Sequence, residues 1–405
     1  MGLNPAQPQS TPDSPRLWTI RALYFFYFAG AGIYVSFINV YYSSIGLSGF
    51  QIGIINTLAP VIGIFGSLLW GMLSDRFGKI RLLMMAAALG SAVASFGVGT
   101  ARTFSWILPL AAVYSLFVST IGQLLDSSNL AELGEHKDRY GMQRIWGTIG
   151  FTITSSTIGL VLEKTGLHFM FLLYPILMLA LLAFTPGLRS RPIRLSESLF
   201  KGVSQMVRKP EWQFFAVSVF LLVLGSNGVS NFLGIAMKDM GAQDWMIGMV
   251  WTMSALAELP VMFFGAHLVR RLGAQRMLVL AFMFYIVRIS LFGLMPDPSW
   301  ALWINLMNAC TYGIFWIGGV TYANDLAPDN LKVTSQSLLL VVINISAAAG
   351  SPLSGWLYDK IGKHLFLVGG ACALAAWLVF LVGQFVTRKK NQVLVQALPG
   401  GTNQT

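Results

Sequence analysis

Two charged residues stand alone inside long apolar segments, and their spacing about a turn predicts that they meet. Arg288 is the only charged residue in 277–295, and Glu258 is the only acid in 245–268. Glu258 lies 14 residues before Leu272, where the chain is expected to turn, and Arg288 lies 16 residues after it. At about 1.5 Å per residue, two antiparallel helices would place them within about 3 Å in depth. We predict a carboxylate–guanidinium pair that takes up and releases a proton at Glu258, with a purely structural ion pair as the alternative.

A second acid and a second arginine are placed in the same way. Asp126 and Arg144 each lie nine residues from Glu135, so two helices that turn there would hold them at equal depth. A guanidinium matches an oxyanion such as a carboxylate, although an acid of the protein can neutralise it first. Both residues lie near the predicted cytoplasmic ends of their helices. The alternative to a binding role is therefore that Arg144 is an ordinary arginine at the membrane surface.

The apolar segments around these residues are long enough to cross a membrane. The chain is 55% hydrophobic and only 11% charged, whereas about a quarter of an average soluble domain is charged. A helix needs about 20 apolar residues to cross the bilayer core. Twelve such spans are predicted, at residues 19–43, 51–73, 81–100, 104–128, 143–163, 167–186, 213–237, 244–268, 276–295, 300–324, 334–357 and 364–387.

Positive charge collects on one side of these predicted spans. With the N-terminus inside, 21 of the 27 lysines and arginines fall in cytoplasmic loops and tails, 5 fall outside, and Arg288 belongs to neither side. This is the positive-inside pattern, and it predicts a multi-pass plasma-membrane protein with both termini in the cytoplasm. It also accounts for the net charge of +11 without a nucleic-acid partner. Cys310 and Cys372 lie in apolar segments, so we expect neither a disulfide framework nor a metal site.

A short pattern occurs four times along the chain and divides it into repeats. The four copies begin at residues 71, 159, 266 and 355 and read GMLSDRFG, GLVLEKTG, AHLVRRLG and GWLYDKIG. The first two starts are 88 residues apart and the last two are 89 apart, which predicts a three-helix unit repeated four times. The extra residues in the middle fall in a basic stretch. The predicted organisation is a cytoplasmic tail at 1–18, a helical bundle at 19–186, a cytoplasmic linker at 187–212, a second bundle at 213–387 and a cytoplasmic tail at 388–405.

The first copy, extended to GMLSDRFGKIRLL at residues 71–83, resembles the loop signature of the major facilitator superfamily. The resemblance implies an all-α integral membrane protein with twelve transmembrane helices in two six-helix bundles, working by alternating access. It also implies that the signature residues control the conformational change. These residues are Gly71, Asp75, Arg76, Gly78, Lys79 and Arg81.

Residues 24–42, 140–151 and 257–289 resemble the branch of this superfamily that holds lactose permease, phenylpropionate permease and nucleoside–proton symporters. The resemblance implies proton-coupled symport of a small organic solute, such as an aromatic carboxylate, a nucleoside or an oligosaccharide. It implies no bound cofactor, with the proton gradient as the energy source. It also places a proton-coupling arginine at Arg288 and substrate-binding residues at Asp126 and Arg144.

The chain departs from lactose permease in the predicted tenth helix. There lactose permease carries a histidine and a glutamate important for proton coupling, and the ungapped positions here hold Asn308 and Thr311. Neither side chain titrates. The proton is then carried by Glu258 alone, or the coupling is different or absent.

Polar and aromatic residues on four predicted helices suit the lining of a central cavity. The resemblance makes the first, fourth, seventh and tenth helices line it, and residues at helical spacing would share one face. The candidates for substrate contact are Tyr27, Tyr34, Gln123, Asn227, Asn231, Asn308, Tyr312 and Trp316, together with Asp126 and Arg144. The alternative for any one of them is a hydrogen bond between helices, worth about 0.6 kcal/mol in a membrane.

Two other functions remain open on the sequence alone. An exporter of hydrophobic compounds driven by proton antiport would use the same fold, and so would a membrane sensor that transports nothing. An enzyme is disfavoured because the chain contains no HExxH, GxSxG or phosphate-binding loop. We expect a monomer in a bacterial inner membrane.

Overall fold

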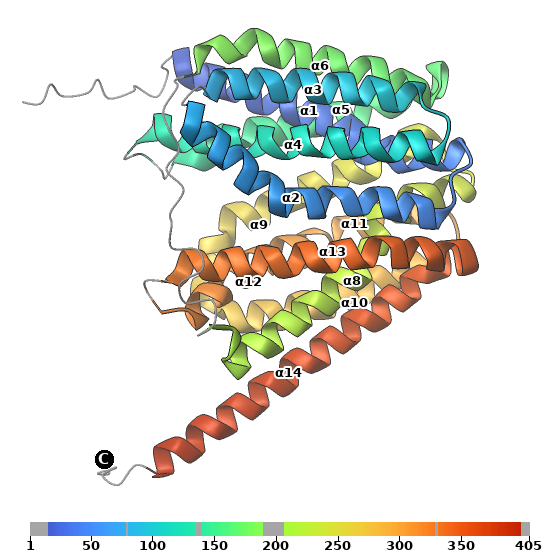
Figure 1. The fold of residues 1–405 in the computed structure, drawn as a ribbon. Coiled ribbons are helices and arrows are strands. Elements are labelled where there is room, and N and C mark those ends of the chain that lie inside the picture. Colours follow the sequence, from blue (N-terminus) through green and yellow to red (C-terminus); the bar gives the residue numbers. More distant parts are fainter. Residues whose placement is uncertain are drawn as a thin grey trace, which may run out of the picture. The chain divides into compact units, whose positions relative to one another are not determined.

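Every regular element in the described part of the chain is a helix (Figure 1). The computed structural model describes residues 15–77, 80–134, 136, 139–188, 206–328 and 331–397, and the side chains of 15–16, 65–77 and 388–397 lie outside the description. The predicted all-α class is therefore confirmed. Most of the predicted linker and of the N-terminal tail falls outside the described residues, whereas residues 388–397 of the predicted C-terminal tail continue the last helix.

Most helices begin and end near the predicted positions, but the predicted span 300–324 is divided and the last helix continues to Ala397. Up to residue 187 they are α1 (Pro15–Ser44), α2 (Gly49–Phe77), α3 (Ile80–Thr100), α4 (Phe104–Leu133), α5 (Tyr140–Thr165) and α6 (Met170–Phe184), with short 3-10 turns η2 (Leu167–Phe169) and η3 (Thr185–Gly187). After residue 209 they are α8 (Pro210–Asp239), α9 (Asp244–Leu272), α10 (Ala274–Leu294), α11 (Trp300–Leu306), a π-helical turn η4 (Ala309–Gly313), α12 (Ile314–Leu326), α13 (Lys332–Ile361), a 3-10 turn η6 (Gly362–His364) and α14 (Leu365–Ala397).

The final glycine of the repeated pattern ends a helix in each copy where the structure describes it. Gly166, Gly273 and Gly362 have φ angles of 84°, 74° and 56°. Only glycine adopts this left-handed backbone without strain, and it lets the chain turn into the next helix at once. The turn between α9 and α10 therefore falls at Gly273, as the spacing of Glu258 and Arg288 requires.

Among the described residues, nine stretches are long and apolar enough to cross a membrane, and the last of them, 332–387, contains α13 and α14 as far as residue 387. The segment Gly49–Ile64 of α2 is a shorter apolar helix. Large apolar side chains are exposed on these helices; Phe263 is 84% exposed, Trp303 73% and Phe385 72%. Lipid, unlike water, accepts such a surface, so the protein is a multi-pass membrane protein.

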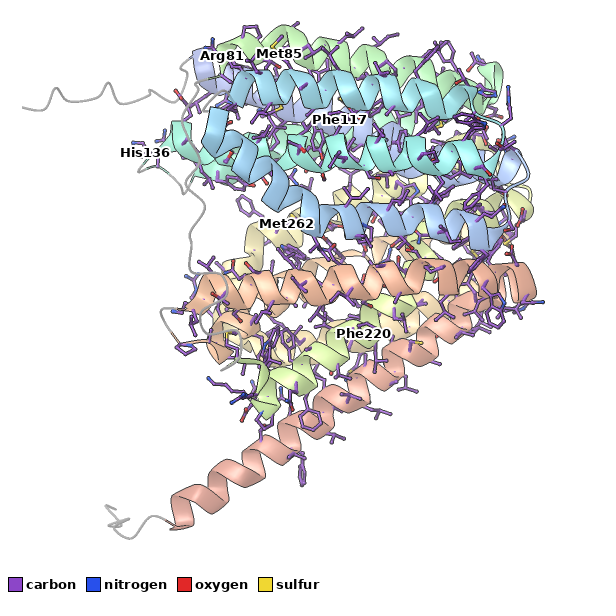
Figure 2. The ribbon with its side chains drawn as sticks, viewed as in Figure 1. Arg81, Met85, Phe117, His136, Phe220 and Met262 are labelled. Carbon is purple, nitrogen blue, oxygen red and sulfur yellow. The ribbon has the colours of Figure 1, made fainter. Side chains whose placement is uncertain are left out.

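One compact unit contains the described residues of Met1–Ile45, Ile62–Leu195 and Gln243–Ala255. In it α1 packs against α4, α5 and α6, and α3 packs against α4 and α6 (Figure 1). Small residues allow the close approach. A Cβ on Gly32 of α1 would lie 2.8 Å from the carbonyl oxygen of Phe151 in α5, and one on Gly90 of α3 would meet the ring of Phe117 in α4 (labelled in Figure 2).

The other compact unit contains the described residues of Gly46–Val61, Ser196–Ala242 and Leu256–Thr405. In it α8 packs against α13 and α14, and α10 packs against α12 and α14. Gly225 of α8 and Gly369 of α14 face each other, because a Cβ on either would lie 2.5 Å from the carbonyl oxygen of the other.

The units differ from the predicted bundles by two helix segments. The first part of α2 packs within the second unit, and the first part of α9 packs within the first unit. Each of these helices contains a proline close to the change, Pro60 in α2 and Pro260 in α9. The boundaries of the two predicted bundles stay a prediction.

Candidate functional site

Arg288 is buried in the second unit and is held by three neutral side chains. Only 7% of its surface is exposed. One terminal nitrogen donates to Oδ1 of Asn308 at 2.5 Å and to the hydroxyl of Thr311 at 2.9 Å, and the other donates to Oδ1 of Asn305. The guanidinium carbon also lies 5.6 Å from the ring centroid of Phe292. A buried cation requires such acceptors, since an unpaired charge in this position is strongly disfavoured.

The acceptors come from an interrupted helix. The sequence predicts one continuous span at 300–324, but the structure divides it into α11, the π-helical turn η4 and α12. The N–H of Gly313 donates to the carbonyl of Asn308 at 3.3 Å, five residues back. Asn305, Asn308 and Thr311 lie at intervals of three residues along this segment, and all three reach Arg288. Single π-helical turns within α-helices are frequent at functional sites.

Glu258 joins this cluster through Asn308. The side-chain nitrogen of Asn308 donates to Oε1 of Glu258, while its oxygen accepts from Arg288. The sequence prediction is a direct carboxylate–guanidinium pair. The structure brings the two residues into one cluster as expected, but inserts an amide between them. Glu258 is half-buried, whereas Asn308 is buried.

Asp126 and Arg144 lie in a second polar cluster, in the first unit. Oδ1 of Asp126 accepts from the hydroxyl of Tyr24 at 2.6 Å and from the hydroxyl of Tyr140 at 2.9 Å. The side chain of Asn129 donates to the same Tyr24 hydroxyl at 3.4 Å. Two phenol donors from α1 and α5 therefore stabilise the carboxylate of α4.

Arg144 is stabilised by aromatic rings. Its guanidinium carbon lies 4.1 Å from the ring centroid of Phe28 and 5.7 Å from that of Tyr24, both on α1. A cation over a ring face gains about 0.5–2 kcal/mol, more when it is desolvated. In the described contacts the guanidinium of Arg144 lies over these rings, and the carboxylate of Asp126 accepts hydrogen bonds from the two phenols. The structure places the two residues in one region, since Tyr24 contacts both, and their role in substrate binding stays a prediction.

The other predicted contacts in the first unit divide into open and packed residues. Gln123 is exposed, and the hydroxyl of Tyr27 donates to the carbonyl of Val118 at 3.5 Å. Tyr34 is 8% exposed and stacks on Tyr114, with ring centroids 4.1 Å apart and an angle of 16° between the planes. Tyr34 therefore belongs to the packed interior of this unit, because its ring is needed between helices.

The second unit divides its predicted contacts in the same way. The amide of Asn231 donates to the hydroxyl of Ser351 at 3.1 Å and to Oδ1 of Asn227 at 3.3 Å, which joins α8 to α13. For Asn227 and Asn231 the structure therefore shows the alternative to substrate contact, a hydrogen bond between helices. Tyr312 is 40% exposed and stacks on Trp316, with centroids 5.9 Å apart. Tyr312 is thus an exposed ring that stacks on the half-buried Trp316.

Only part of the predicted gating motif can be placed. Gly71, Asp75 and Arg76 belong to α2, but their side chains lie outside the described residues, as do Gly78 and Lys79 entirely. Arg81 is the second residue of α3 (labelled in Figure 2), and its Nε donates to the carbonyl of Leu188 beyond η3. The motif residues therefore stay predictions.

Six members of these clusters are not predicted from the sequence: Asn305 and Phe292 beside Arg288, and Tyr24, Phe28, Asn129 and Tyr140 around Asp126 and Arg144. Asn305 lies three residues before Asn308, so helical spacing could have identified it. Tyr24 and Tyr140 occur in the stretches used for the family resemblance, but nothing in their spacing indicates that both hydroxyls bind Asp126.

Apolar spanning helices around two polar clusters define the protein as a multi-pass helical membrane protein. The chain belongs to the major facilitator superfamily, since the family described as "MFS_1 like family" matches residues 17–368. The chain is 25% identical to the maltose permease of Geobacillus stearothermophilus, over 89% of this chain and 92% of the relative. It is also 25% identical to a probable 3-phenylpropionic acid transporter of Escherichia coli (strain K12), over 87% and 94%.

A solved structure supports the same fold. The nucleoside transporter NupG matches with a TM-score of 0.81 and 17% identity, over 91% of this chain and 99% of that chain. The resemblance to the transporter branch predicted from the sequence is confirmed, and membrane transport is the activity of the relatives.

Proposed function

We propose that the protein is a proton-coupled symporter that carries a small organic solute into the cell. The observation that supports this most is the chain of hydrogen bonds from Glu258 through Asn308 to Arg288. It connects a carboxyl, which can bind a proton, to a fixed buried cation. No bound cofactor is required, because the proton gradient supplies the energy.

Glu258 is the proposed proton carrier, and Asn308 couples it to Arg288. With Glu258 ionised, the amide of Asn308 donates to the carboxylate and accepts from the guanidinium. When Glu258 binds a proton, the charge that holds the amide in this orientation is gone. A change in protonation at Glu258 thereby alters the bonding of Arg288 to the α11–η4 segment. Asn308 and Thr311 need not titrate in this scheme, since they act as fixed acceptors.

The solute is proposed to carry an anionic group on an apolar or aromatic body. Arg144 supports this, because its charge is met by the rings of Phe28 and Tyr24, and a guanidinium on an aromatic face still has N–H groups for an oxyanion. Tyr312, which stacks on Trp316, offers an exposed ring to an aromatic group. Aromatic carboxylates fit this chemistry best, and nucleosides and oligosaccharides are the further classes to test.

The remaining parts of the proposal concern the whole molecule. Twelve crossings in two six-helix bundles would alternate access to the substrate, with the signature residues at 71–81 controlling the change. Both termini would face the cytoplasm of a bacterial inner membrane, and a monomer would suffice.

Ligand-induced stabilisation tests the proposal. The melting temperature of the purified protein is measured with aromatic carboxylates, nucleosides and disaccharides. Each is tested at about pH 6 and about pH 8, below and above neutral pH. At about 100 times the dissociation constant, a ligand should stabilise the folded state by about 2.7 kcal/mol. We expect one class to stabilise more strongly at acid pH, and Glu258→Gln to remove the pH dependence.

Glu163→Gln is the matched control, because Glu163 is an exposed acid near the end of α5. It should leave the pH dependence unchanged. Stabilisation that is equal at both pH values in the parent protein would contradict proton coupling and would favour a uniporter or a sensor.

A further inference from the structure

The carboxylate of Asp359, in the last turn of α13, binds the beginning of α2, 310 residues earlier in the chain. Oδ1 accepts from the N–H of Gly49 at 2.6 Å, and Oδ2 accepts from the N–H of Phe50 at 2.9 Å. These are the first two N–H groups of α2, which have no partner within their own helix. A carboxylate at this position is stabilised by both bonds and by the helix dipole.

The position of Asp359 is unfavourable for its own helix. A negative charge near the C-terminus of a helix interacts poorly with the dipole of that helix, and Asp359 lies two residues before the end of α13. The neighbouring copy of the pattern provides a comparison. Glu163 occupies the corresponding place in α5, 196 residues earlier. Among the described hydrogen bonds, none joins its carboxylate to the first N–H groups of another helix. The contact with α2 is therefore the interaction that Asp359 gains.

Behind Asp359, α2 and α13 touch along glycine backbones. A Cβ on Gly49 would lie 2.6 Å from the carbonyl oxygen of Gly355, and a Cβ on Gly53 would overlap the carbonyl of Ser351. Further along, the hydroxyl of Thr57 donates to the carbonyl of Ala348 at 3.1 Å. The two helix segments run in opposite directions, since Gly49, Gly53 and Thr57 meet Gly355, Ser351 and Ala348 in turn (Figure 1). At these three positions α2 meets carbonyl oxygens of the α13 backbone.

α2 can leave this contact without losing its own first turn. The hydroxyl of Ser48 accepts from the N–H of Gln51 at 3.2 Å, and the Gln51 side chain accepts from the N–H of Ser48 at 3.0 Å. This reciprocal pair is a capping box. Asp359 is exposed, so water can replace α2 as its partner. In addition, Pro60 lacks the N–H that would bond four residues back, which weakens α2 where its contacts change from one unit to the other.

We propose that Asp359 and the first turn of α2 form a releasable latch, which favours the conformation with this end of α2 closed on α13. The inference rests on the proposed alternating access, because it assigns a conformational change to the release of α2. Asp359 would set the balance between closed and open conformations at this end, without contacting substrate or proton.

Accessibility of a cysteine at the contact tests the latch. Thr57→Cys provides a thiol on the contacting face of α2, and its rate of reaction with a maleimide is measured on the purified protein in detergent, without substrate or gradient. The parent protein with Cys310 and Cys372 alone gives the background. In Asp359→Asn the negative charge and one acceptor oxygen are lost, so the reaction should be about 2- to 5-fold faster, the effect of one charge at a helix N-terminus.

Glu163→Gln is the matched control and should leave the rate unchanged. Asp359→Glu retains a carboxylate and should react at a rate between those of the parent and Asp359→Asn. If Asp359→Asn does not fold, the Asp359→Ala rate decides, since a rate equal to the parent would contradict the latch. Equal rates in all variants would overturn the proposal. A faster rate in Asp359→Asn, together with ligand stabilisation that is equal at both pH values in the parent protein, would keep the latch and refute proton coupling.

Discussion

The side-chain amide of Asn308 donates a hydrogen bond to the carboxylate of Glu258, in the part of α9 that packs in the second unit. The bond links the protonation state of Glu258 to Asn308, at the junction of α11 and η4. Its strength can be measured apart from transport.

A double-mutant cycle measures this bond. Asn308→Ala and Glu258→Ala, singly and together, should show a coupling energy of about 0.5–3 kcal/mol in the free energy of unfolding, because the two side chains are in contact. Reversible unfolding in mixed detergent is the measurement. The same cycle with Glu163→Ala in place of Glu258→Ala should be additive to within about 0.5 kcal/mol. Additivity in both cycles would show that the amide is not coupled to Glu258.

Arg288→Lys should destabilise the protein. A lysine has one nitrogen and cannot bind Asn305, Asn308 and Thr311 with the geometry of a guanidinium. At least one buried acceptor would then lack its donor, at a cost of about 1–3 kcal/mol. Thermal unfolding is the measurement, and Arg276→Lys is the control, since Arg276 is exposed near the start of the same helix. An unchanged melting temperature for Arg288→Lys would mean that the three contacts add little.

Arg144→Lys should weaken the binding of anionic solutes more than that of neutral ones. The substitution keeps the positive charge but loses the planar group that lies over Phe28 and donates to an oxyanion. We expect about a tenfold rise in the dissociation constant, which corresponds to about 1.4 kcal/mol. Titration calorimetry with a matched acid and amide pair measures the difference. Arg139→Lys, at the start of α5, should change neither value, and an equal loss for acid and amide would place the anionic group elsewhere.

Gly150→Ala should disturb the packing of α1 on α5. A Cβ on Gly150 would overlap the carbonyl of Phe25, which belongs to the backbone and cannot move alone. Overpacking of this kind costs about 1–3 kcal/mol. Gly141→Ala on the same helix is the control, since its Cβ would meet nothing within 4 Å, and it should be neutral or slightly stabilising. A melting temperature for Gly150→Ala that matches the Gly141→Ala value would contradict the close approach.

Much of the fold follows from the sequence because lipid imposes simple rules. Long apolar segments must be helices, and the glycines that end the repeated pattern fix where α5, α9 and α13 stop. The depth of Glu258 and Arg288 follows from the same counting, since both helices leave one turn. Equal depth does not determine which side chains touch, however, and the structure inserts Asn308 between the two charges.

The less predictable features depend on side-chain partners from distant helices. Tyr24 and Phe28 are four residues apart on α1, and together they stabilise Asp126 and Arg144, but an apolar, aromatic helix gives no sign of this. Tyr34 looks equally suitable for a cavity, and only its stacking on Tyr114 assigns it to the interior. The interruption at η4 is also not predictable from the sequence, because residues 309–313 contain no proline or other helix-breaking pattern.

The π-helical turn at Ala309–Gly313 has a consequence for alignments with relatives. A hydrogen bond that spans five residues encloses one residue more than the α-helical bond that spans four. In a relative, the helix that corresponds to α11, η4 and α12 can be regular. Its residues would then be offset by one position from those of this chain on one side of the turn. Position-by-position comparison is then sound up to Asn308, whereas the partner of Thr311 depends on where the gap is placed, and structures of both proteins must be superposed before it is assigned.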